Sequence, residues 1–120
     1  MEKQKVCIIG GGLTGLITAL ALSKLNLNVD LVIGSIKAHI ASNKTTAISQ
    51  ENYYFLKQLK IINFSKIKFW PCTKMKLYTE KKFNKFDEIF EIKKDKNHKE
   101  KILYMMNNAQ VVAYLIKSIK

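Results

Sequence analysis

The sequence predicts an α/β fold for this chain of 120 residues. Three observations lead to this prediction. Residues 6–9 form a β-branched run that ends in glycines, residues 13–25 form an apolar segment of helix length, and residues 29–33 form a second short apolar run. A strand, a helix and another strand in this order are typical of a βαβ unit with parallel strands. We expect helices and a small β element to follow it.

Length and composition indicate one globular domain. A chain with 48% hydrophobic and 25% charged residues can bury a single core. Cys7 and Cys72 have no metal-ligand spacing around them and are expected to be buried thiols in a reducing compartment. His39 and His98 have no carboxylate or cysteine at catalytic or metal-binding spacing, so surface roles are expected for both. The sequence therefore predicts no metal site and identifies no catalytic residue.

The formal net charge of +12 is compatible with an anionic partner. All 21 basic residues are lysine, however, and base readout and phosphate forks favour the planar donors of arginine. We therefore expect a solvated lysine coat and no specific nucleic-acid binding. A basic patch that acts at nucleic acid or at an anionic membrane surface remains the alternative.

Residues 6–23 carry no charge and follow a basic start, as a signal peptide or membrane anchor would. A spanning helix needs about 20 mostly apolar residues, but Gly10, Gly11 and Gly12 interrupt this run. Each glycine costs a helix about 1 kcal/mol relative to alanine. We therefore predict a strand, a loop and a helix, with neither a signal peptide nor a transmembrane segment, and expect a cytoplasmic protein.

The loop glycines have the spacing Gly-x-Gly-x-x-Gly, which is the dinucleotide-binding fingerprint between a strand and a helix. Gly10 would permit the tight turn, Gly12 would let the backbone approach a diphosphate, and Gly15 would let the helix pack close to the strand. Free N–H groups and the helix dipole would then face the phosphates. This pattern predicts a Rossmann-like unit. The residues expected to contact the nucleotide here are Gly10, Gly11, Gly12, Leu13, Thr14 and Gly15.

The end of the second predicted strand departs from the fingerprint, which places there an acid that binds the ribose hydroxyls. This chain has Ile33, Gly34 and Ser35 at that point. Asp30 comes three residues earlier and is expected to be an exposed acid in mid-strand. Ser35 is expected to offer the ribose a weaker hydrogen bond. The missing acid disfavours NAD in particular, because that acid is its main ribose contact.

The rest of the chain is expected to hold two helices and a β element. One helix is predicted over residues 49–59 with Ser49 as its N-cap, and another from an Asn108 cap to the end of the chain. Pro71 is expected to break regular structure, and alternation between residues 75 and 104 predicts strands. Residues 93–101 would be a charged turn before a return strand at 102–104. The side chains expected on the helical core faces are Ile48, Phe55, Leu59 and Ile62, and Val111, Val112, Leu115, Ile116 and Ile119.

Three segments, residues 6–33, 44–61 and 102–119, resemble the N-terminal part of a known family. The first is similar to a flavin-binding unit, the second to a basic residue followed by an Ala-Leu-Ser-like run, and the third to an asparagine or arginine that leads into a leucine-rich helix. The family is that of the FAD-dependent aromatic-ring monooxygenases, and the branch is the hydroxylases of ubiquinone biosynthesis. The segments span nearly the whole chain but only the first third of the family's length.

This resemblance implies that residues 1–120 are a partial FAD-binding domain that is inactive alone. It implies FAD as the cofactor, NAD(P)H as the reductant of the complete enzyme and a quinone-precursor ring as its substrate. It also implies peripheral membrane association through the substrate pathway, at the inner face of the membrane. Lys44 matches a family arginine that approaches the flavin, and Ile33 matches the ribose-binding acid. A module that binds FAD or NAD without hydroxylase activity remains the alternative.

Overall fold

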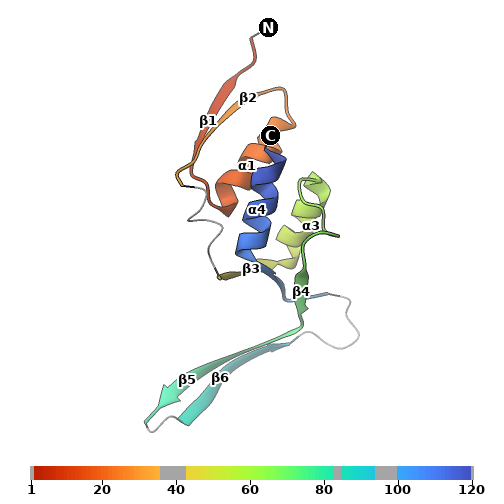
Figure 1. Cartoon of the computed structure of the whole chain (residues 1–120). Coiled ribbons are helices and arrows are strands. Elements are labelled where there is room, and N and C mark those ends of the chain that lie inside the picture. Colours follow the sequence, from red (N-terminus) through yellow and green to blue (C-terminus); the bar gives the residue numbers. More distant parts are fainter. Residues whose placement is uncertain (1, 36–42, 83–84, 94–99, 120) are drawn as a thin grey trace.

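The computed structural model of the chain describes residues 2–35, 43–82, 85–93 and 100–119 (Figure 1). It is a mixed α/β structure, as the sequence predicts. His39 and His98 lie outside the described residues. The elements in chain order are β1 (Lys5–Ile9), α1 (Leu13–Ser23), β2 (Asn28–Val32), β3 (Thr45–Ser49), α3 (Gln50–Leu59), β4 (Phe69–Cys72), β5 (Lys74–Lys81), β6 (Lys85–Lys93), β7 (Leu103–Asn107) and α4 (Asn108–Ser118).

Strands β1 and β2 pair in parallel, and helix α1 connects them, so the predicted βαβ arrangement is present. Alternate side chains of both strands, such as Val6 opposite Val29, are half-buried on the face that α1 covers. The other face is open to solvent. Cys7 lies on it and is exposed, so the expectation of a buried thiol is wrong for this residue. Asp30, opposite Cys7, is exposed as expected.

Strands β3, β7 and β4 form an antiparallel sheet in that order, with β7 in the centre. Two sequence expectations are wrong here. Regular structure does not end at Pro71, which lies in β4, because β4 is an edge strand and an edge tolerates a missing N–H group. The return strand, β7, does not pair with the strand that precedes the charged segment, since its partners are β3 and β4.

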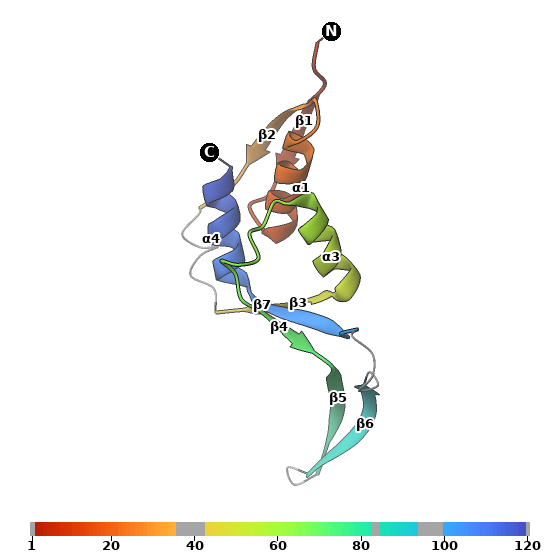
Figure 2. The same cartoon turned by 90° about the vertical axis from the view of Figure 1, so that its right-hand side faces the viewer.

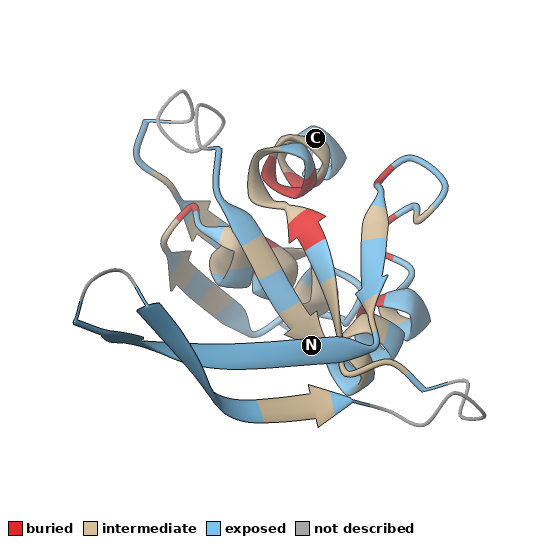
Figure 3. Cartoon of the chain, turned by 90° about the horizontal axis from the view of Figure 1, so that it is seen from below, coloured by how far each residue is buried: buried red, intermediate tan, exposed pale blue. Residues whose placement is uncertain are grey.

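Strands β5 and β6 form a two-stranded hairpin that extends away from the rest of the molecule (Figures 1 and 2). Every residue of β5 is exposed, as are most residues of β6 (Figure 3). Register places Met75 and Leu77 opposite Ile92 and Phe90, which makes one apolar face. The opposite face carries the ion pairs Lys74–Glu91 and Lys76–Glu88. The hairpin is therefore amphipathic but uncovered.

The core lies between the helices and the inner face of the three-stranded sheet, with α1 packed against α4. Its buried side chains are Leu16, Leu56, Ile61, Ile62, Ile67, Met106, Val111, Val112 and Leu115. The apolar face predicted for α4 is largely confirmed, although the helix ends at Ser118 and Ile119 is 39% exposed. Phe55 was expected in the core but is 53% exposed, so that expectation is wrong.

The N-cap of α3 is the residue that the sequence predicts, whereas the N-cap of α4 lies one residue before the predicted one. The N–H group of Asn52 donates to Ser49 Oγ, which confirms Ser49 as the N-cap of α3. The cap of α4 is Asn107, whose Oδ1 accepts from the N–H group of Gln110, and Asn108 is the first helical residue. None of the helices in the described ranges has the length and hydropathy that crossing a bilayer requires.

Candidate functional site

The first part of the candidate site is the glycine loop between β1 and α1. Gly10 has a φ of +131°, a conformation that side chains rarely allow. Its N–H group donates to the carbonyl oxygen of Val32 over 2.9 Å, which fixes the loop beside the end of β2. The tight turn that the sequence assigns to Gly10 is therefore present, and it lies at the carboxyl ends of both parallel strands.

Packing requires glycine at position 15, because there is no room for a side chain. A Cβ atom on it would lie 2.1 Å from the carbonyl oxygen of Gly10, which is far inside van der Waals contact. The first turn of α1 thus lies directly against the turn that follows β1. This is the close approach of helix and strand that the fingerprint predicts for its third glycine.

Gly12 differs, because nothing within the described chain requires it to be glycine. It is the N-cap of α1, its φ of −76° suits any residue, and a Cβ atom on it would meet no atom within 4 Å. Its carbonyl oxygen accepts the first helical hydrogen bond, from the N–H group of Leu16. A methyl group here would therefore project into open space beside the helix N-terminus.

The N-terminus of α1 is suited to an anion. Within the described ranges no side chain caps it, and its first turn holds no acidic residue. The N–H groups of the first turn have no partner within the helix, so they and the positive end of the helix dipole are available to a ligand. Gly12 and Thr14 are exposed there, Leu13 and Gly15 are half-buried, and Gly11 is buried. The predicted loop residues are thus gathered in one place, while their contact with a nucleotide stays a prediction.

The second part of the site is the chain at the start of β3, where Lys44, the residue before the strand, lies beside the first residue of α4. The N–H group of Asn108 donates to the carbonyl oxygen of Lys44 over 3.0 Å. Thr46 Oγ1 donates to Asn108 Oδ1 over 3.3 Å. Strand β3 was missed by the sequence analysis, although the β-branched residues among Thr45–Ile48 are a signal for it. Asn108 and Thr46 are consequently residues of the site that the sequence analysis did not identify.

A groove of about 440 Å³ is lined by the first turn of α1 and by β3, although the loop glycines, Lys44 and Asn108 are not among its lining residues. Its walls come from α1, β3, α3 and β7: Leu13, Thr14, Ile17, Thr18, Thr46, Ile48, Asn52, Phe55, Leu56 and Met106. Thr46 thus lies across the groove from the first turn of α1. The groove also explains the exposure of Phe55, because its ring lines this opening instead of the core.

The end of β2 supports ribose binding less well than the glycine loop supports diphosphate binding. Ile33 is half-buried, and Ser35 is exposed just beyond the strand. Asp30 faces away from α1, on the open side of the sheet. The bond from Gly10 holds Val32, the last residue of β2, beside the loop, and Ser35 follows three residues later with a hydroxyl group.

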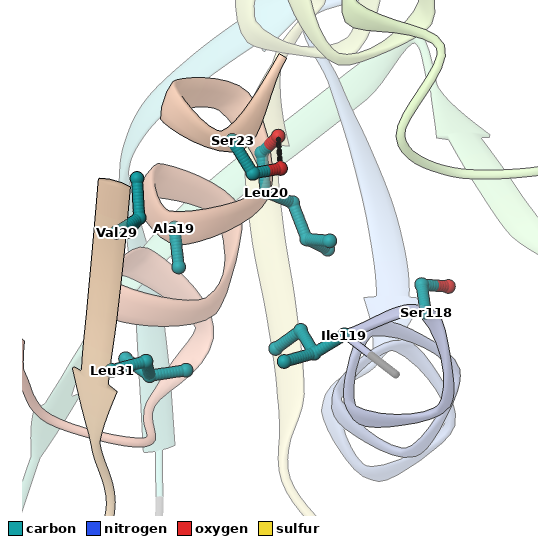
Figure 4. A pocket seen from close by; sticks show the side chains of 7 residues that line it. All are labelled: Ala19, Leu20, Ser23, Val29, Leu31, Ser118 and Ile119. Carbon is teal, nitrogen blue, oxygen red and sulfur yellow. Dashed lines mark hydrogen bonds between the residues drawn. The ribbon is translucent and has the colours of Figure 1, made fainter. Parts of the chain in front are cut away.

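A second cavity, of about 260 Å³, lies between α1, β2 and the end of α4 (Figure 4). Its lining is mostly apolar. Ser23 Oγ donates to the carbonyl oxygen of Leu20, and Ser118 Oγ donates to that of Tyr114, so both hydroxyl groups are used within their own helices. This cavity offers a ligand little beyond apolar contact.

The remaining polar chemistry of the described chain lies away from the loop. Burial raises the pKa of the Tyr104 hydroxyl, and the ring of Tyr104 stacks on that of Tyr53 with centroids 3.9 Å apart. These rings belong to an aromatic cluster on the three-stranded sheet. In residues 2–35, 43–82, 85–93 and 100–119, no group of three or more His, Cys, Asp or Glu side chains could hold a metal ion.

Comparison with known proteins gives the fold a precedent. No family model matches the chain, and no curated protein sequence is significantly similar to it. Among solved structures, 2,6-dihydroxypyridine-3-hydroxylase from Arthrobacter nicotinovorans is similar, with a TM-score of 0.65 and 15% sequence identity. The likeness covers 99% of this chain and 27% of the hydroxylase. The chain therefore has a fold that forms about a quarter of that enzyme.

Proposed function

We propose that this chain is the FAD-binding N-terminal portion of a flavin-dependent monooxygenase that hydroxylates an aromatic ring in ubiquinone biosynthesis, and that it is inactive alone. The likeness to a dihydroxypyridine hydroxylase supports the class of enzyme. The three sequence segments that resemble ubiquinone-pathway hydroxylases support the branch. The chain spans 27% of the similar hydroxylase, so the active site of a complete enzyme would need further polypeptide.

The observation that carries the proposal is the open space at Gly12. Gly10 and Gly15 are explained by the backbone itself, through a positive φ and a close contact. Gly12 has neither reason, yet it stands at the uncapped N-terminus of α1. A ligand whose phosphates approach this backbone supplies the missing reason, since a side chain would occupy its place. The residues present therefore fit the diphosphate of FAD.

In this proposal the first-turn N–H groups of α1 hold the FAD diphosphate, Lys44 supplies a positive charge and Ser35 bonds the ribose. FAD supplies the redox chemistry, with NAD(P)H as its reductant and a quinone-precursor ring as the substrate of the complete enzyme. Lysine in place of arginine gives one flexible cation instead of a planar fork, so the contact of Lys44 is less directional.

Flavin binding tests the proposal directly. Purified chain is titrated with FAD, and the absorbance bands and fluorescence of the flavin are followed after removal of free ligand. We expect retained flavin for the wild type and loss of it for Gly12→Val. Ser23→Val, which places the same new side chain at the other end of α1 in exchange for a hydroxyl that bonds Leu20, is the matched control and should bind as the wild type does. A chain that ignores FAD at high concentration contradicts the proposal.

The alternative is a dinucleotide module without a hydroxylase role, and competition separates the two cofactors. We expect FAD to displace NAD, because Ile33 replaces the acid on which NAD depends. We further propose a cytoplasmic location with peripheral association at the inner face of the membrane. The exposed apolar side chains of the β5–β6 hairpin support such an association, and sedimentation with lipid vesicles tests it.

A further inference from the structure

Asn108 connects two segments that are far apart in the sequence. Its N–H group donates to the carbonyl oxygen of Lys44, and its Oδ1 accepts from Thr46 Oγ1, 62 positions away. One bond reaches Lys44, the residue directly before β3, and the other reaches Thr46, the second residue of that strand. Asn108 is half-buried, so these bonds are partly shielded from water. The pair of bonds fixes where β3 begins relative to α4.

The position of the start of β3 also bears on Lys44, the residue that directly precedes this strand. Thr46 and Ile48 follow it two and four residues further along the chain. Both of those residues line the groove whose other wall contains Leu13 and Thr14 of the first turn of α1. Lys44 is therefore two residues along the chain from a side chain that lines the same groove as the first turn of α1.

We infer that Asn108 is a positioning residue that holds Lys44 for the diphosphate of the dinucleotide. The inference deepens the proposed function and rests on it. Asn108 contributes through the Thr46 bond, because that bond and the main-chain bond to Lys44 together restrain the strand start. Without the side-chain bond, the start of β3 is less restrained, so the Lys44 ammonium group lies on average further from the phosphates, and its attraction to them falls with distance.

The experiment compares FAD with riboflavin, which has the same ring system but no phosphate. For each variant the ratio of the two dissociation constants is measured from flavin fluorescence. Asn108→Ala and Thr46→Val should each reduce the preference for FAD by about fivefold, as expected for one hydrogen bond. Their double variant should show no further loss, because both remove the same bond. Thr46→Ser keeps the hydroxyl group and should retain the preference.

Asn107→Ala is the matched control. It removes the neighbouring asparagine, whose Oδ1 caps α4, and therefore weakens the helix without touching the Lys44 or Thr46 bonds. It should leave the FAD-to-riboflavin preference unchanged even where stability falls. Lys44→Gln should reduce the preference at least as far as Asn108→Ala.

The outcomes separate the two proposals. A wild-type chain that binds neither FAD nor ADP overturns the proposed function and the inference together. A wild type that prefers FAD, with Asn108→Ala and Asn107→Ala showing the same preference as the wild type, overturns the role of Asn108 alone. Equal weakening of FAD and riboflavin by Asn108→Ala also overturns it, because that result is the signature of a merely structural residue.

Discussion

The carbonyl oxygen of Gly10 lies 2.1 Å from the place that a Cβ atom on Gly15 would occupy. This contact distinguishes two kinds of glycine in one loop. Gly15 serves the fold, since the backbone oxygen that faces it cannot move without disturbing the turn. A Cβ atom on Gly12 would meet no atom within 4 Å, so packing within the described residues gives no reason for glycine at this position.

Gly15→Ala is therefore expected to destabilise the chain by about 1–3 kcal/mol, the usual cost of overpacking. Gly12→Ala should cost less, about 0.5–1 kcal/mol, because an N-cap prefers glycine to alanine but no atom obstructs the added Cβ atom. Urea unfolding followed by circular dichroism measures both. Equal stability losses in the two variants would show that the contact at Gly15 is relieved by a shift of the loop.

Loss of a helix cap gives a second prediction. Ser49→Ala removes the acceptor for the Asn52 N–H group at the start of α3 and should cost about 1 kcal/mol of stability. Ser65→Ala is a suitable control, because its hydroxyl bonds Asn63 in an exposed turn outside the helices. Denaturant unfolding compares the two, and a control that falls as far as Ser49→Ala would argue against a specific cap effect.

Truncation of two apolar side chains, one buried and one exposed, should cost very different amounts of stability. Leu115 is 0% exposed, so Leu115→Ala should cost about 2–5 kcal/mol through lost burial and a residual cavity. Phe55 is 53% exposed at the groove, and Phe55→Ala should cost much less despite its larger side chain. Thermal unfolding measures both variants. A large loss at Phe55 would place its ring in the core after all.

The β5–β6 hairpin predicts a dependence on pH. The hydrogen bond from Lys74 lowers the pKa of Glu91 below its ordinary value of 4.5, against the opposing effect of desolvation. The unfolded carboxyl titrates at the higher value, so the stabilisation by this pair is fully present above pH 4.5. It is lost as the pH falls through the lowered pKa.

An NMR titration of the Glu91 carboxyl carbon measures this effect. In Lys74→Gln the pKa of Glu91 should rise toward the ordinary value, and added salt should act in the same direction in the wild type because Lys74 is exposed and Glu91 is only partly buried. Lys57→Gln, a lysine of α3, is the control and should leave the titration of Glu91 unchanged. An unaltered Glu91 titration in Lys74→Gln would contradict the assigned cause.

The sequence predicted the elements whose signals are local. A β-branched run, a glycine loop and an apolar segment lie side by side in residues 6–33, so each interpretation supports the next. Strands β3 and β4 depend instead on β7, which pairs with both from a distant part of the chain. No local pattern shows that Pro71 will lie at a sheet edge, where its missing N–H group costs little.

The residues of the candidate site likewise divide into those that local sequence patterns predict and those that depend on long-range pairing. The glycine positions follow from spacing alone, whereas Asn108 becomes a residue of the site only because β3 and β7 pair in register. Adjacent asparagines also look alike as caps, and the end of β7 decides that Asn107 takes this role. The exposure of Phe55 was hidden because helical periodicity shows which side chains share a face, but not whether that face is covered.

The extended hairpin has a hydrodynamic consequence. The radius of gyration is 18.3 Å, whereas a compact chain of this length has about 14 Å. A particle 63 Å long and 24 Å across at its narrowest diffuses more slowly than a sphere of the same 13.8 kDa mass. A single copy of the chain will therefore elute from a gel-filtration column ahead of compact standards of its size, and light scattering is needed to tell its elongation from the pairing of two copies.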